Sequence, residues 1–321
     1  MRIDASGCGF GLIVMFSGLI AGGLARREPD GWLRRLVVGF KATSALAFIG
    51  LCGSLATFCL GTLANGYVDS LLADADAHLG LDWVALYRFT QHHRPVQALG
   101  KFFYLSIFFS PTIVVAALAA TGREQFLNRF VMTFAVSLAL VLAFFPFFPA
   151  HSALFHFLGD KGGYVPVVGT THVSILDALQ AGQMRTISLG GLIGLVTFPS
   201  FHATTAILFA WAGWRVAAVR GLLLILNLGM LAATPIEGTH YFVDVIAGTL
   251  CALAAIAATS PRLARTGRGL LVRHRLQHDM PHRRIRRRHV VESVQLLDLA
   301  AERTTHDQPH DKLDPLGPRL A

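Results

Sequence analysis

The chain is too apolar for an ordinary soluble enzyme. Of its 321 residues, 53% are hydrophobic and only 15% are charged, against roughly 25% charged residues in a typical soluble domain. The net charge of +9 comes largely from ten arginines between residues 262 and 288, so the basic character belongs to a tail. The four cysteines show neither CxxC nor CxxH spacing, which predicts no disulfide framework and no zinc site.

Apolar segments along the chain predict an all-α integral membrane protein with about seven transmembrane helices. A helix needs roughly 20 predominantly apolar residues to cross about 30 Å of hydrocarbon. Segments of this kind occur near residues 8–25, 42–65, 102–121, 130–148, 201–214, 221–235 and 240–259.

The first of these segments allows two interpretations. Arg2, the short apolar run and the small residues at 21–23 are typical of a cleavable signal peptide. Asp4 and the arginine pair at 26–27 favour a retained helix instead. We expect retention, and the other six helices do not depend on this choice.

The distribution of basic residues predicts the orientation of the helices. Lys and Arg follow the first, third, fifth and seventh segments, at 26–41, 123–129 and 215–220 and in the C-terminal tail. The loops at 66–101 and 149–200 contain more Asp. Because cytoplasmic loops carry an excess of Lys and Arg, we expect the N-terminus outside and the C-terminus inside.

The residues after about 260 differ in composition from the rest of the chain. Arg, His, Asp and Pro dominate there, which predicts a partly disordered cytoplasmic tail. The run HRRIRRRH at 282–289 is typical of an extended positively charged anchor. Binding to anionic lipid head groups, or to nucleic acid in a soluble protein, is the alternative. In a membrane chain we expect no nucleic-acid partner.

Two histidines lie at the outer ends of predicted helices, where an ionisable side chain is costly and usually functional. His202 follows Pro199 and Ser200, which suit the start of a helix. His240 precedes Asp244 by four residues. A helix would place this pair on one face, where the carboxylate can hold one imidazole nitrogen.

An imidazole held by a carboxylate is suited to nucleophilic attack on phosphorus. Its free nitrogen becomes more basic, and a second, protonated histidine can give its proton to the departing alkoxide. Helix N-termini would favour the charge on the phosphate oxygens. The alternatives are packing roles for the histidines, a metal site formed by His202, His240 and Asp244, and a proton-relaying transporter.

Two short motifs resemble a known family. Residues 199–202 (PSFH) and 240–248 (HYFVDVIAG) are similar to the second and third signature motifs of the type 2 phosphatidic acid phosphatase superfamily. The resemblance covers about fifteen residues directly and, through the order of the apolar segments, residues 42–259. It implies a six-helix core with the active site at the outer face. It also implies that His240 forms a phosphohistidine, that Asp244 orients it, and that His202 protonates the leaving group.

The chain departs from the family pattern where the phosphate is held. Ala233 and Thr234 stand where most lipid phosphatases of the superfamily carry a Ser-Arg pair, and the Lys-x6-Arg-Pro motif is missing close to Pro199. This form resembles the branch that contains inositol phosphorylceramide synthases, which transfer a head-group phosphate to a lipid alcohol.

The protein must still supply positive charge close to the phosphate oxygens. For substrate binding we expect Arg185, together with Ser200 and Lys161. An interfacial snorkelling role is the alternative for Arg185.

These observations give three predicted regions. They are an N-terminal transmembrane helix with a basic cytoplasmic loop (1–41), a six-helix membrane catalytic core (42–259), and a basic cytoplasmic tail (260–321).

The expected function is that of a lipid-phosphate phosphatase or phosphotransferase. It would act on a phospholipid or lipid-linked phosphate at the outer face of a bacterial inner membrane, with no cofactor and no metal. The alternative is a head-group transferase with a lipid alcohol as acceptor, and the distant alternative is a proton-coupled transporter. The sequence indicates no oligomeric state.

Overall fold

The computed structural model describes residues 2–4, 20, 31–159, 161–184, 186–188 and 192–260. All of them lie in one compact unit, Met1–Ser260. The predicted tail and nearly all of the predicted first helix at 8–25 lie outside the described residues, as does Arg185.

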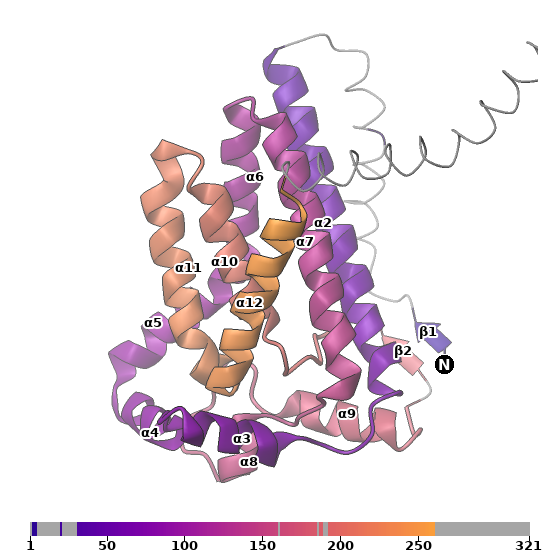
Figure 1. Ribbon diagram of the computed structural model, residues 1–321, viewed down its shortest axis with the longest axis vertical. Helices are drawn as coiled ribbons and strands as arrows, with labels where there is room; N and C mark the ends of the chain where they lie inside the picture. Colours follow the sequence, from indigo (N-terminus) through magenta and orange to yellow (C-terminus); the bar gives the residue numbers. More distant parts are fainter. Residues whose placement is uncertain are drawn as a thin grey trace, which may run out of the picture. The chain divides into compact units, whose positions relative to one another are not determined.

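Long helices form a bundle in this unit. The chain passes through α2 (Trp32–Gly61), then α5 (Arg94–Leu105), the 3-10 turn η1 (Ser106–Phe108) and α6 (Ser110–Ala120), then α7 (Glu124–Phe144) and η2 (Phe145–Phe147). It returns through α10 (Phe201–Gly213), α11 (Ala217–Glu237) and α12 (Phe242–Ala258). These helices run along one another in Figure 1.

Shorter helices gather at one end of the bundle, the lower end in Figure 1. They are α3 (Asp69–His78), α4 (Trp83–His92), α8 (Ala153–Leu158) and α9 (Thr171–Gln180). Two three-residue strands, β1 (Arg2–Asp4) and β2 (Thr186–Ser188), pair in parallel beside them, with Ile3 opposite Ile187. Because α10 and α12 begin at this end, we call it the histidine end.

Hydropathy and length identify fewer membrane spans than the sequence predicts. Among the described residues, three helices are long and apolar enough to cross a membrane, namely Trp32–Gly61, Glu124–Phe147 and Ala217–Glu237. The pair Arg94–Phe108 and Ser110–Ala120, bent by 49°, makes a fourth if it is one span. The apolar helix α12 is shorter. The prediction of a helical membrane protein is thus supported, whereas the count of seven is not reached.

One helix start differs from the predicted one for a physical reason, and one short helix lies where it was predicted. Helix α2 begins at Trp32, so Arg34, Arg35 and Lys41 belong to a helix and not to a loop. A hydropathy window excludes these residues, yet Arg and Lys are good helix formers. Helix α10 agrees with the predicted segment 201–214. It has 13 residues, about 20 Å at 1.5 Å per residue, because the chain reaches it through a non-helical segment, 192–200.

Helix α4 fixes the layer of short helices to the bundle. Its Trp83 is 2% exposed and donates a hydrogen bond from Nε1 to the carbonyl of Pro235 in α11, at 2.9 Å. The Tyr87 hydroxyl donates to the Tyr164 carbonyl at 2.7 Å and accepts from the Tyr164 amide at 2.9 Å. Buried polar groups are therefore paired across the joint, as a stable interface requires.

Basic side chains gather at the opposite end of the bundle. Arg34 in α2 pairs with Glu124 in α7 at 3.1 Å, and Arg35 donates to the carbonyl of Ala120, the last residue of α6, at 3.0 Å. Arg129 donates to the carbonyl of Ile256 in the last turn of α12, at 3.1 Å. We call this the basic end.

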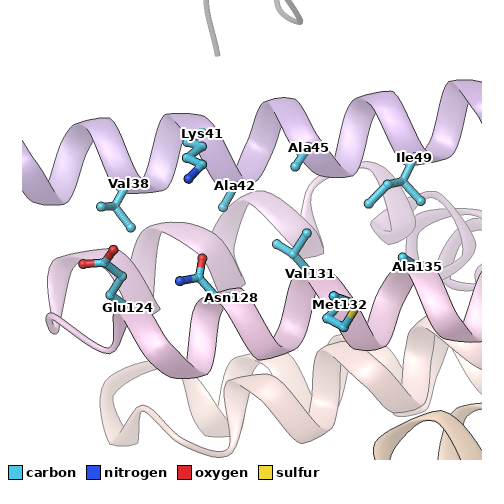
Figure 2. Close-up of a pocket in the computed structure, with 10 residues that line it drawn as sticks. All are labelled: Val38, Lys41, Ala42, Ala45, Ile49, Glu124, Asn128, Val131, Met132 and Ala135. Atoms are coloured by element: carbon cyan, nitrogen blue, oxygen red, sulfur yellow. The ribbon is translucent and has the colours of Figure 1, made fainter. Parts of the chain in front are cut away.

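A groove of about 260 Å³ lies between α2 and α7. Figure 2 shows Lys41, Glu124 and Asn128 at one part of it and apolar side chains such as Ile49 and Met132 farther along. Neither candidate catalytic histidine lines this groove, so the chemistry must be sought elsewhere.

Candidate active site

The start of α12 brings His240 and Asp244 into contact. Nδ1 of His240 lies 3.2 Å from Oδ2 of Asp244, and the Tyr241 amide donates to the same oxygen at 2.9 Å. Both side chains of the pair are buried, Asp244 completely. A carboxylate that accepts from Nδ1–H leaves Nε2 with the lone pair. The predicted four-residue spacing therefore places the carboxylate on one imidazole nitrogen and leaves the other nitrogen free.

The start of α10 places His202 beside Tyr104. Ser200 caps this helix, with its Oγ accepting from the Ala203 amide at 3.3 Å. The Tyr104 hydroxyl lies 3.2 Å from Nδ1 of His202, and the two rings stack with centroids 4.0 Å apart. The stacked ring and the hydroxyl together fix the orientation of the His202 imidazole.

Backbone contacts lock the starts of α10 and α12 together. The Ser200 amide donates to the Asp244 carbonyl at 3.0 Å, and the Thr204 hydroxyl donates to the Gly248 carbonyl at 2.9 Å. A Cβ at position 248 would collide with the Ser200 carbonyl oxygen. Glycine is therefore what allows the two histidine-bearing turns to approach this closely.

Both histidines line one cavity of about 610 Å³. Tyr104, Thr171 and His172 also face it, and most of its remaining wall is apolar, contributed by α2, α7, η1 and segment 192–197. Among the described residues that line it there is no Lys, Arg, Asp or Glu. The cavity thus combines an apolar interior with imidazole and hydroxyl groups.

Helix α3 supports the start of α12 from outside. Asp76 accepts hydrogen bonds from the amides of Phe242 and Val243, each at 2.8 Å. Burial raises the pKa of Asp76, and these two amide bonds oppose the rise. A carboxylate at a helix N-terminus satisfies free N–H groups and the helix dipole. Asp76 therefore positions the turn that follows His240.

Glu237 is a buried acid at the end of α11, although it lies between the predicted helices at 221–235 and 240–259. Its side chain is 1% exposed and accepts from the Tyr164 hydroxyl at 2.6 Å and from the Val167 amide at 3.1 Å. These bonds hold the segment that carries Val167 and Val168 against the cavity.

The predicted substrate-binding residues are not gathered around the cavity. Ser200 is buried and its hydroxyl serves as a helix cap. Lys161 is exposed and does not line the cavity, and Arg185 lies outside the described residues. The phosphate-binding assignments of these three residues stay predictions.

Sequence reasoning missed Tyr104 and Asp76. It places His172 in the loop at 149–200, mainly as a loop residue, with a position in the wall of the site as the alternative. Each lies far along the chain from the residue it serves. For example, 98 residues separate Tyr104 from His202. No spacing pattern could reveal these contacts, because they form only when helices distant in sequence pack together. No group of His, Cys, Asp or Glu within the described residues is arranged to hold a metal ion.

The comparisons with known proteins agree with the motifs. The sequence model of the PAP2 superfamily matches residues 70–258, more than half of the chain. This range includes His202, His240 and Asp244. The curated proteins gave no match, and neither did the solved structures. The match confirms the superfamily predicted from the motifs: the chain belongs to the PAP2 superfamily.

Proposed function

We propose that this protein is a membrane-embedded lipid-phosphate phosphatase or phosphotransferase that works through a phosphohistidine at His240. Membership of the superfamily supports phosphatase-type activity. The observation that carries the proposal is the shared cavity, into which a carboxylate-held His240 and a stacked His202 both open.

Two half-reactions follow from this arrangement. In the first, Nε2 of His240 attacks phosphorus, the bond to the leaving oxygen breaks, and protonated His202 gives that oxygen its proton. In the second, the oxygen of an acceptor hydroxyl attacks phosphorus, the P–N bond breaks, and the acceptor proton passes to His202. Asp244 holds the imidazole of His240 throughout and stabilises its positive charge.

The apolar wall of the cavity supports a lipid substrate. Its volume of about 610 Å³ lies within the range of roughly 300–1,000 Å³ that is typical of small-molecule sites. Leu138, Val141 and Phe108 would contact an acyl or isoprenoid chain while the phosphate meets the histidines. In this proposal the phosphate oxygens face the first turns of α10 and α12, and Arg185 remains the candidate cation.

The distribution of charge supports an outward-facing site. Arg34, Arg35 and Arg129 mark the basic end, while His202 lies in the first turn of α10 and His240 just before the start of α12. Since Lys and Arg are retained on the cytoplasmic side, we place the histidine end at the outer face of the membrane and the C-terminus inside.

A head-group transferase is the second candidate. It is favoured by Thr234, which stands where most lipid phosphatases of the superfamily have arginine and whose buried hydroxyl donates to the Met230 carbonyl at 2.7 Å. The inositol phosphorylceramide synthase-like branch expected from the motifs belongs to this candidate. In it a lipid alcohol occupies the acceptor position.

Product analysis of the purified full chain tests both candidates. Mixed micelles without divalent metal would contain phosphatidic acid, phosphatidylinositol and ceramide, with mass spectrometry as the readout. We expect orthophosphate from a phosphatase and a new phosphoryl-head-group lipid from a transferase. His240→Ala should abolish either product, and an alkaline quench of the wild type should yield a phosphorylated His240 peptide.

The matched control is His92→Ala, which removes an exposed histidine at the end of α4. It should leave turnover unchanged. Retained turnover in a folded His240→Ala variant would overturn the phosphohistidine mechanism.

A further inference from the structure

A third histidine lies in the wall of the catalytic cavity. His172 occupies the first turn of α9, is 4% exposed, and lines the cavity together with His202 and His240. It belongs to neither of the two sequence motifs, and the two half-reactions above assign it no role.

The backbone fixes the tautomer of His172. Its Nε2 is in hydrogen-bond contact with the carbonyl oxygen of His151, and a carbonyl can only accept, so Nε2 carries the proton. His151 is itself held, because its amide donates to Asp69 at 2.9 Å and its ring contacts Asp177 at 2.9 Å. In neutral His172 the lone pair must therefore lie on Nδ1.

That lone pair has no partner in the part of the chain that the structure describes. Nδ1 of His172 is buried and makes no hydrogen bond there. Leaving a buried acceptor unpaired is unfavourable, and such groups in native proteins usually meet a ligand or a water. Burial lowers the pKa of His172, the bond to His151 opposes this, and the charge of His240 lowers it further. The ring is thus kept neutral and able to accept.

We propose that Nδ1 of His172 positions the water molecule that hydrolyses the phosphohistidine. This inference rests on the proposed function. A water molecule has two O–H groups, so it can pass one proton to His202 while the other O–H donates to His172. Its oxygen attacks phosphorus, the P–N bond to His240 breaks, and orthophosphate leaves. An alcohol has a single O–H and cannot donate to both histidines, so the proposal makes water the preferred acceptor.

Two substitutions separate this role from a structural one. His172→Gln keeps an N–H donor that can reach the His151 carbonyl but removes the acceptor at the Nδ1 position. His172→Asn keeps an acceptor near Nδ1 but loses the bond to His151. A purely structural histidine would tolerate Gln better than Asn, whereas a water-positioning histidine would show the opposite order.

The experiment follows phosphoenzyme formation and breakdown in wild type and both variants, by rapid alkaline quench and mass spectrometry of the His240 peptide. Formation should be unchanged in His172→Gln, while breakdown slows about tenfold, the order expected for one lost hydrogen bond. His172→Asn should break down at nearly the wild-type rate. With methanol added, the ratio of methyl phosphate to orthophosphate should rise about tenfold in His172→Gln only.

Each outcome bears on one of the two proposals. A folded His172→Gln variant with normal breakdown and an unchanged product ratio overturns the role of His172. If that variant does not fold, the wild type still tests the role of His172. Equal rate constants for phosphoryl transfer to methanol and to water in the wild type would overturn that role. Absence of phosphorylated His240 in the wild type refutes the proposed function instead.

Discussion

At the scale of single residues, Asp244 determines what His240 can do. Its Oδ2 contacts Nδ1 of His240 and accepts from the Tyr241 amide, so one oxygen fixes both the ring and the turn that carries it. Oδ1 has no hydrogen-bond partner among the described residues. A buried carboxylate with spare acceptor capacity is suited to stabilising an adjacent positive charge.

Replacing Asp244 by Asn should separate these contributions. The amide keeps the shape and can still accept from Tyr241, but it loses the charge and no longer enforces the tautomer. We expect kcat to fall by about 10³- to 10⁴-fold, as in other carboxylate–histidine pairs, with the protein still folded. Steady-state kinetics in mixed micelles would measure this.

The control is Asp74→Asn, because Asp74 lies on α3 with an exposed side chain. It should leave kcat within about twofold of the wild type, since exposed charges contribute little. A loss of less than tenfold in folded Asp244→Asn would show that the carboxylate is not needed to orient His240.

At the scale of elements, the distance between His202 and His240 depends on how closely α10 and α12 approach. They touch through Ser200, Thr204 and Gly248, and the Ser200 amide donates to the carbonyl of Asp244. The partner across the Gly248 contact is backbone, which cannot rotate away as a flexible side chain can. The contact is therefore sensitive to a single methyl group.

Gly248→Ala should therefore disrupt the site without touching a histidine. The new Cβ would push the start of α10 from α12, at a cost of about 1–3 kcal/mol in stability. Moving His202 relative to His240 should reduce kcat by about 10² or more, because misplacement of about 1 Å has that effect. Thermal unfolding in detergent and steady-state kinetics would measure both changes.

Gly221→Ala is the matched control within α11. Nothing lies within 4 Å of a Cβ built there, so the change should be neutral or stabilising by up to about 1 kcal/mol, with normal turnover. Equal behaviour of the two alanine variants would show that the approach of α10 to α12 does not set the catalytic geometry.

At the scale of the described unit, the two ends of the bundle differ in chemistry. At the basic end, arginines bond to groups at the ends of neighbouring helices. At the histidine end, the histidines lie next to the layer of short helices. In membrane proteins the end that is richer in Lys and Arg usually faces the cytoplasm. It predicts that the histidine end faces out.

Cysteine accessibility on intact cells would test this orientation. In a background without native cysteines, Leu79→Cys marks the end of α3 and Ala217→Cys marks the start of α11, and both positions are exposed. A membrane-impermeant maleimide should label Leu79→Cys on intact cells and Ala217→Cys only after permeabilisation. The reverse pattern would place the site in the cytoplasm.

The sequence predicted a good part of the helical layout. The apolar runs at 130–148, 221–235 and 240–259 coincide with α7, α11 and α12, because hydrocarbon forces long apolar stretches to be helical. The positions at which the helices begin and end were less predictable. A hydropathy window cannot include the basic first turns of α2.

The sequence alone determined what depends on composition and short spacing. These are the apolar helices, the superfamily, and the contact of His240 with Asp244, since a four-residue interval on a helix leaves only one geometry. Tertiary structure alone decided which distant groups complete the site. Tyr104 beside His202, Asp76 at the start of α12 and His172 in the cavity wall come from other helices, and only their packing brings these helices together.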